Sequence, residues 1–131
     1  TGDANYAILD GGIHHLNYFG QRMAMQVPPI SIYRADGVEL TQLPDIDYTL
    51  CGSLCTVADV LVREVKLKKL ELGDILEFAH CGAYSVTEAP ALFLSRQLPA
   101  IYAYSKKNGF ELLREYVATS DINRAHMFDC I

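Results

Sequence analysis

The chain has 131 residues, which is enough for one domain with a single hydrophobic core. Half of the residues are hydrophobic and 21% are charged, an ordinary composition for a globular protein. The net charge of −5 argues against nucleic acid as the main partner, because phosphate binding requires clustered Lys and Arg.

Several further features restrict the cellular setting that we expect. No apolar run approaches the ~18 residues of a membrane span, and no signal-peptide pattern is present. The four cysteines are irregularly spaced, which indicates free thiols of a cytoplasmic protein rather than a disulfide framework. Because the chain begins at Thr1 without a methionine, we expect a processed or excised piece. The cysteines are Cys51, Cys55, Cys81 and Cys130.

Short β-branched, apolar or aromatic runs between Gly, Pro, Asn and Asp predict a mainly β domain. Tight turns are expected at Asp36-Gly37, Leu72-Gly73-Asp74 and Asn108-Gly109. Seven strands in this pattern favour a Greek-key-like barrel or sandwich. The predicted strands are Tyr6–Leu9, Ile30–Arg34, Tyr48–Leu54, Asp59–Val65, Asp74–Ala79, Ala100–Ser105 and Phe110–Val117.

One or two short helices are expected besides the strands. One covers roughly Val86–Leu94 and is limited by Pro90. The other starts near Ser120 or Asp121, either of which can cap the first turn. Alternation in the fourth strand predicts that Val60 and Val62 share one face, with Leu61 on the opposite face.

Two segments carry residues suited to chemistry. In Gly52–Asp59, the thiol of Cys55 follows a Gly-Ser pair and precedes an acid by four residues. A thiol is useful in catalysis where it is partly exposed, but a cysteine such as Cys55, taken alone, is more often a small buried hydrophobe. In His80–Ser85, a turn before a helix presents Tyr84, which can bind a phosphate or can simply pack at a rim.

A metal site is a weaker possibility. The adjacent residues His14 and His15 point in different directions on any regular element, so they seldom chelate one ion. Combining one of them with His80 and cysteines is conceivable, but the spacing of Cys51 and Cys55 is poor for zinc and no second pair matches it. We therefore expect no metal ion.

Taken together, the motifs resemble the C-terminal part of the diaminopimelate, ornithine and arginine decarboxylase family. The resemblance rests on five motifs in the order and spacing of that family, and it covers nearly the whole chain. The motifs are Asp10-Gly11-Gly12, the Gly-x-x-Cys-x-x-x-Asp run ending at Asp59, Leu70–Leu76, Gly82-Ala83-Tyr84, and Phe93-Leu94-Ser95-Arg96 before Pro99.

This resemblance implies a fold like the C-terminal domain of alanine racemase and a decarboxylase that uses pyridoxal 5′-phosphate (PLP). Cys55 then corresponds to a cysteine that enters the active site of the partner subunit, near the carbon that is protonated after CO₂ leaves. Thr56 corresponds to a residue that binds the distal part of the substrate. Tyr84 matches a tyrosine that contacts the PLP phosphate, and Asp59 matches an acid that supports the dimer interface.

Two departures from the family pattern concern the substrate. Thr56 is neutral where the family usually has an acid for a distal amine. The arginine expected to bind a distal carboxylate is missing, although Arg22 lies several residues later and could substitute. The His14-His15 pair and Phe93–Arg96 instead look like a branch that acts on modified or carrier-bound amino acids.

The resemblance also implies partners. The family's cofactor lysine and phosphate loop lie on an N-terminal (β/α)₈ barrel, and residues 1–131 show no such βα alternation. We therefore expect a single C-terminal domain of a larger homodimeric enzyme, inactive by itself, whose substrate is an amino acid. The alternatives are a stand-alone β-barrel binding module without catalysis and a metal-stabilised β domain.

Overall fold

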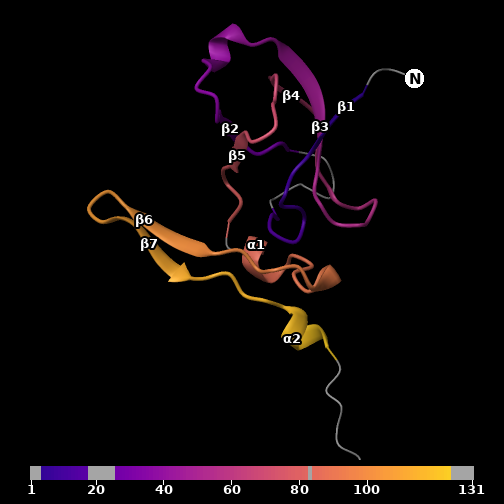
Figure 1. The fold of residues 1–131 in the computed structure, drawn as a ribbon, viewed down its shortest axis with the longest axis vertical. Coiled ribbons are helices and arrows are strands. Elements are labelled where there is room, and N and C mark those ends of the chain that lie inside the picture. Colours follow the sequence, from indigo (N-terminus) through magenta and orange to yellow (C-terminus); the bar gives the residue numbers. More distant parts are fainter. Residues whose placement is uncertain (1–3, 18–25, 83, 125–131) are drawn as a thin grey trace, which may run out of the picture. The chain divides into compact units, whose positions relative to one another are not determined.

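A computed structural model describes residues 4–17, 26–82 and 84–124 (Figure 1). The chain forms two compact units, residues 1–89 and residues 90–131. Within the described residues, the first unit contains five strands and one short α-helix, and the second contains a hairpin and one short α-helix. The strands are β1 (Asn5–Ile8), β2 (Ile30–Tyr33), β3 (Asp45–Cys51), β4 (Val60–Lys68), β5 (Ile75–Phe78), β6 (Ile101–Ser105) and β7 (Gly109–Arg114), and the α-helices are α1 (Tyr84–Thr87) and α2 (Ser120–Asn123).

The strands pair into three separate sheets. In the first unit, β1 runs parallel to β3, and β3 pairs antiparallel with β4. A second sheet of that unit pairs β2 with β5, and the second unit contains the antiparallel β6–β7 hairpin. The prediction of a mainly β domain with two short helices is confirmed, although the sheets do not close into a barrel within the described ranges.

All seven predicted strands are present, with ends that differ by a few residues. The expected alternation in β4 is wrong, because Val62 pairs with Leu50 but Val60 pairs with the next residue, Cys51, so the register shifts at Leu61. Leu61 and Val62 are both buried. Glu64 has a φ of 53°, and the pairing with β3 shifts between Tyr48 and Leu50. This irregularity is a β-bulge, which changes the face that successive side chains occupy.

The helix predictions also need correction. Helix α1 ends at Thr87, and a separate 3₁₀ turn, Phe93–Ser95, follows Pro90. Proline supplies no backbone N–H and therefore does not continue a helix. Neither Ser120 nor Asp121 is the cap of α2: the N-cap position belongs to Thr119, whose hydroxyl donates to the Arg96 carbonyl at 2.8 Å instead.

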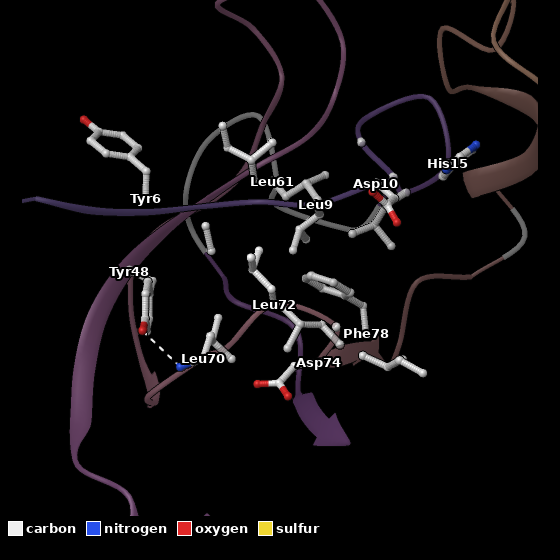
Figure 2. A pocket seen from close by; sticks show the side chains of 18 of the residues that line it. Tyr6, Leu9, Asp10, His15, Tyr48, Leu61, Leu70, Leu72, Asp74 and Phe78 are labelled. Atoms are coloured by element: carbon white, nitrogen blue, oxygen red, sulfur yellow. Dashed lines mark hydrogen bonds between the residues drawn. The ribbon is translucent and has the colours of Figure 1, made fainter. Parts of the chain in front are cut away.

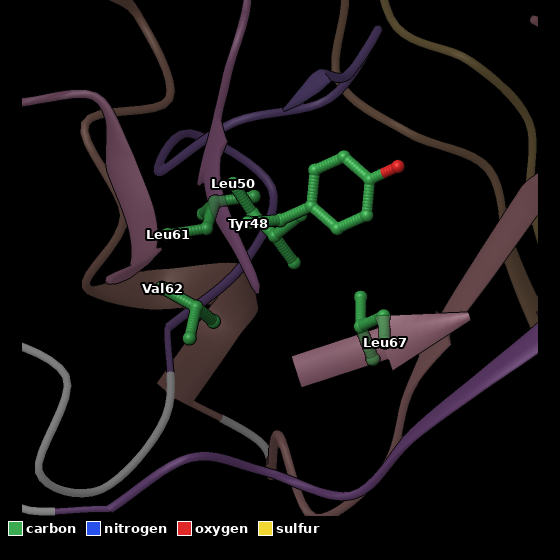
Figure 3. Packing of buried hydrophobic residues seen from close by; sticks show 5 residues of the cluster. All are labelled: Tyr48, Leu50, Leu61, Val62 and Leu67. Atoms are coloured by element: carbon green, nitrogen blue, oxygen red, sulfur yellow. The ribbon is translucent and has the colours of Figure 1, made fainter. Parts of the chain in front are cut away.

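The core of the first unit lies between its two sheets. Five buried side chains of β3 and β4 form its centre (Figure 3). Apolar residues of β2 and β5 pack against this cluster, so that both sheets share one core. Leu50 is completely buried, and burial of a leucine contributes roughly 1.5–3 kcal/mol to stability. The five central residues are Tyr48, Leu50, Leu61, Val62 and Leu67.

A charged cluster fixes the turn between β4 and β5 to the end of β2. The Arg34 guanidinium donates to Asp74 at 3.1 Å and to the Lys69 carbonyl at 3.0 Å. It also pairs with Asp36, and this hydrogen-bonded ion pair lowers the pKa of the Asp36 carboxyl to about 2. Gly73 lies in this turn with a φ of 93°, a conformation that glycine adopts without strain.

Candidate functional site

The loop that joins β3 to β4 carries the candidate catalytic thiol. Cys55 is exposed in this loop, whereas Leu54 just before it is buried. The Gly52 N–H donates to the Asp59 carbonyl at 2.9 Å and closes the base of the loop. The interpretation of Cys55 as a buried hydrophobe is therefore wrong for the described fold. We name residues 52–59 the thiol loop.

Asp59 ends the thiol loop and is only 3% exposed. Its carboxylate accepts the Ile13 N–H at 2.8 Å and the Leu54 N–H at 2.7 Å, one on each oxygen. Both bonds are short and charge-assisted, which is the class of hydrogen bond that compensates the burial of a carboxylate. Asp59 thus links two segments of the same chain, and its expected role at a dimer interface stays a prediction.

The segment after β1 is fastened by its backbone to the end of β3 and to the thiol loop. The Leu9 N–H donates to the Cys51 carbonyl at 2.8 Å, and the Ser53 N–H donates to the Gly11 carbonyl at 3.0 Å. The Ser53 hydroxyl adds a bond of 2.7 Å to the Asp10 carbonyl. These contacts hold the segment of the Asp-Gly-Gly motif in place through its backbone.

Thr56 lies within the thiol loop and is partly exposed. Its hydroxyl oxygen accepts the Ala58 N–H at 3.2 Å, and its own N–H donates to the Leu54 carbonyl at 2.8 Å. The hydroxyl therefore stabilises the turn and still retains a proton to donate. Arg22, the other candidate for substrate binding, lies outside the described residues.

Tyr84 is the first residue of α1 and is 68% exposed. The following residue anchors this helix: the Ser85 hydroxyl accepts the Asn17 N–H at 3.0 Å and lies 2.7 Å from the Asn17 carbonyl. The Asn17 amide also donates to Glu88 at 3.0 Å. Sequence reasoning missed Asn17, since no local pattern signals a partner 68 residues away.

The thiol loop and α1 are therefore both hydrogen-bonded to one segment, residues 9–17, which supports them. Residues 9–13 bind the thiol loop, and Asn17 binds α1. The relation of Cys55 to Tyr84 around one cofactor stays a prediction, because it depends on a second subunit. Both side chains lie outside the core, as that prediction requires.

A cavity of about 720 Å³ opens beside this support. Figure 2 shows Leu9, Leu61, Leu72 and Phe78 around it, with Asp10 and His15 at one side. The Tyr48 hydroxyl accepts the Leu70 N–H at 3.0 Å within this wall. Neither the thiol loop nor α1 lines the cavity, so the two features are separate.

The buried or partly buried residues His14, His15 and Cys81 were the other candidates for chemistry. His14 is buried, and its ring lies 3.8 Å from that of His15. Burial raises the pKa of the Cys81 thiol, which disfavours a reactive thiolate there. Within the ranges that the structure describes, no three His, Cys, Asp or Glu side chains gather as metal ligands, and no helix is long and apolar enough to cross a membrane.

The exposed groups fit a supporting role around PLP. The Tyr84 hydroxyl can donate to a phosphate, and the exposed Cys55 thiol can donate a proton. Lys68 and Lys69 are engaged in ion pairs with Asp45 and Glu71. Tyr84 and Cys55 thus offer the types of donor that a cofactor pocket uses.

Comparison with known proteins agrees with this arrangement of sheets and exposed loops. Residues 1–82 match the family model of the pyridoxal-dependent decarboxylase C-terminal sheet domain. The chain is 29% identical over 120 residues to the L-glutamyl-[BtrI acyl-carrier protein] decarboxylase of Niallia circulans, covering 89% of this chain and 27% of that protein. It is 35% identical over 99 residues to the 2-[(L-alanin-3-ylcarbamoyl)methyl]-2-hydroxybutanedioate decarboxylase of Staphylococcus aureus, covering 72% of this chain and 24% of that protein.

A solved structure supports the same fold. The diaminopimelate decarboxylase of Methanocaldococcus jannaschii, in complex with L-lysine, superimposes with a TM-score of 0.66 and 26% identity over 93% of this chain and 26% of that chain. The chain thus belongs to the pyridoxal-dependent decarboxylase family and corresponds to its C-terminal sheet domain. It spans about a quarter of the length of the curated relatives it matches.

Proposed function

We propose that this chain is the C-terminal sheet domain of a homodimeric PLP-dependent decarboxylase of modified amino acids. The main observation behind this proposal concerns the thiol loop. Cys55 is exposed, while the backbone on either side of it is fixed to the rest of the domain. An exposed functional group on a well-anchored loop is the arrangement expected of an active-site component. The remaining cofactor contacts come from an N-terminal barrel domain of the same protein.

When bound, PLP supplies the electron sink that stabilises the charge left on the substrate by departing CO₂. In the proposed reaction, the Cys55 Sγ–H of one subunit donates a proton to the substrate Cα in the active site of the other. A thiol suits this step because its pKa lies close enough to neutrality for reprotonation between turnovers. Cys55 therefore controls the last bond formed at the reacting carbon.

Tyr84 binds the cofactor in this proposal. Its hydroxyl lies at the exposed start of α1 and donates a hydrogen bond to a phosphate oxygen. The contacts of Ser85 with Asn17 orient the helix on which Tyr84 lies. Tyr84 contributes to retention of PLP and takes no part in proton transfer.

The substrate class is inferred from Thr56 and from two relatives. A neutral Thr56 cannot form an ion pair with a distal amine, whereas its hydroxyl can donate to an uncharged amide or carbonyl. One relative is named for a glutamyl group on an acyl-carrier protein and another for a carbamoyl-linked alanine derivative. We therefore infer a substrate whose side chain is amide-linked or carrier-bound, and Arg22 is the candidate for any carboxylate on it.

Two further features belong to the same proposal. Asp59 supports the subunit interface by fixing the thiol loop that crosses it. Cys51, Cys55 and Cys81 are free thiols, which favours a cytoplasmic enzyme.

The decisive experiment measures CO₂ release by the complete protein that contains this domain, with and without added PLP. The substrates compared are free glutamate, diaminopimelate and an amino acid whose side-chain carboxyl is amide-linked. We expect PLP-dependent release that is fastest with the amide-linked substrate. Absence of both PLP binding and CO₂ release would refute the proposed reaction, whereas preference for free diaminopimelate would refute only the substrate class.

A further inference from the structure

Cys55 lies between two fixed points of the backbone. On one side, Leu54 is buried and its N–H donates to the Asp59 carboxylate. On the other side, the Thr56 carbonyl accepts the Asp59 N–H at 3.1 Å. Asp59 therefore contacts the residue before the thiol through its side chain and the residue after it through its backbone.

The chain keeps room for the Asp59 carboxylate by placing glycine on two sides of it. A methyl group on Gly12 would lie 2.6 and 2.7 Å from the two carboxylate oxygens, and one on Gly52 would overlap both oxygens and Gly12 itself. Carbon atoms do not approach oxygen so closely without displacement. These two glycines come from separate motifs, and both are explained by the volume of one carboxylate.

A carboxylate is required here by hydrogen-bonding capacity as well as by size. Ile13 and Leu54 each present a backbone N–H, and each N–H meets a different oxygen of Asp59. An amide of the same shape has only one acceptor oxygen, so its NH₂ group would face a second donor. The site therefore distinguishes aspartate from asparagine by one hydrogen bond and one repulsive contact.

We propose that Asp59 is the positioning residue for Cys55. Its buried carboxylate fastens the thiol loop to residues 10–13 and so determines where the exposed Sγ lies. This inference rests on the proposed function and extends it, since the assignment of Asp59 to the subunit interface does not require any effect on proton delivery. A displacement of a catalytic group by about 1 Å can lower a rate roughly 100-fold.

The first experiment is a double-mutant cycle in the complete protein. Asp59→Asn should lower kcat by roughly 10- to 100-fold while KM stays within about twofold. In a Cys55→Ala background, the same substitution should lower kcat by less than about twofold, because the thiol that it positions is gone. Asp47→Asn is the matched control, since Asp47 is an exposed carboxylate on β3.

A second measurement reports on the thiol without any activity. An uncharged alkylating reagent is applied to the PLP-loaded protein, and peptide mass spectrometry gives the modification rate of Cys55 relative to Cys81. Asp59→Asn and Gly52→Ala should both change this ratio by at least about threefold, since both disturb the same carboxylate. Asp47→Asn should leave the ratio unchanged.

Amide hydrogen exchange in the wild-type protein tests the proposal even if a variant does not fold. The Leu54 and Ile13 amides should exchange at least roughly 100-fold more slowly than the amide of Val57, which is 98% exposed in the same loop. Equal exchange at Leu54 and Val57 would overturn the proposal. So would an equal loss of kcat from Asp59→Asn in both backgrounds, because that result indicates a general structural defect.

The inference and the proposed function fail in different ways. Absence of PLP-dependent decarboxylation in the wild type refutes the function, and the alkylation ratio and amide exchange then decide alone whether Asp59 positions the thiol. An active wild type whose Cys55 labelling and kcat are unaffected by Asp59→Asn refutes the inference and leaves the function standing.

Discussion

Asn17 and Ser85 are joined through the backbone of one residue and the hydroxyl of the other, although 68 positions separate them. The Asn17 N–H donates to Ser85 Oγ, and the Ser85 proton is available to the carbonyls of Asn17 and Cys81. This contact attaches the short helix α1 to the segment that also binds the thiol loop. A four-residue helix has little stability of its own, so the attachment determines its position.

Replacing Ser85 with alanine should therefore weaken cofactor binding without touching the cofactor. The substitution leaves the Asn17 N–H without its acceptor, which costs about 1–3 kcal/mol of stability. We expect the dissociation constant of PLP, measured by fluorescence in the complete protein, to rise by at least about threefold. Ser31→Ala, on the exposed face of β2, is the control. Unchanged PLP affinity would show that the attachment of α1 does not affect cofactor binding.

Cys55→Ala should reduce turnover of the complete enzyme by roughly 100- to 10,000-fold, the usual contribution of a general acid. The cofactor should remain bound, because in the proposed reaction the thiol donates to the substrate carbon and not to PLP. The checks are CO₂ release, absorbance of bound PLP, and deuterium incorporation at Cα in D₂O. Wild-type turnover together with an unchanged product would exclude Cys55 as the proton donor.

Tyr84→Phe should weaken PLP binding by about 1–2 kcal/mol, the value of one hydrogen bond to a charged group. Stability should change little, because the side chain is exposed and its ring is retained. The dissociation constant of PLP is the measurement. Tyr102→Phe removes the hydroxyl of another exposed tyrosine, on β6, and should have no effect. An equal effect of both substitutions would contradict a specific phosphate contact.

Leu50→Ala should lower the free energy of unfolding by about 2–5 kcal/mol, since Leu50 is fully buried at the centre of the core. Leu72→Ala should change it by less than about 0.5 kcal/mol, because Leu72 is fully exposed. Urea denaturation followed by circular dichroism measures both variants. Similar losses would mean that the packing in Figure 3 does not describe the core.

The ion pair of Arg34 with Asp36 should make stability depend on acid pH. The folded-state pKa of Asp36 is about 2, below its ordinary value of 3.8. This contribution is therefore complete above about pH 4 and is lost as the pH falls toward 2. Asp36→Asn should lower the urea midpoint at about pH 6 and lower it less at about pH 3. Asp47→Asn should show no such change, and an equal deficit at both pH values would contradict the ion pair.

The sequence by itself determined the class of structure and the family. Its β-branched and aromatic runs predicted all seven strands, because strand formation responds to local side-chain pattern. Glycines marked the turn before β5 and the start of β7, where Gly73 and Gly109 have positive φ. Motif order then indicated a decarboxylase domain, which the family match confirms.

Only the tertiary structure decided which residues support the candidate site. Asp59 binds Ile13 from 46 positions away, and Asn17 binds Ser85 from 68 positions away. Hydrogen bonds over such separations leave no periodic pattern in a single sequence. The bulge at Glu64 and the parallel pairing of β1 with β3 likewise involve strands that are paired only in the folded chain. Strand propensity is a local property, whereas burial of a carboxylate requires donors that folding brings together.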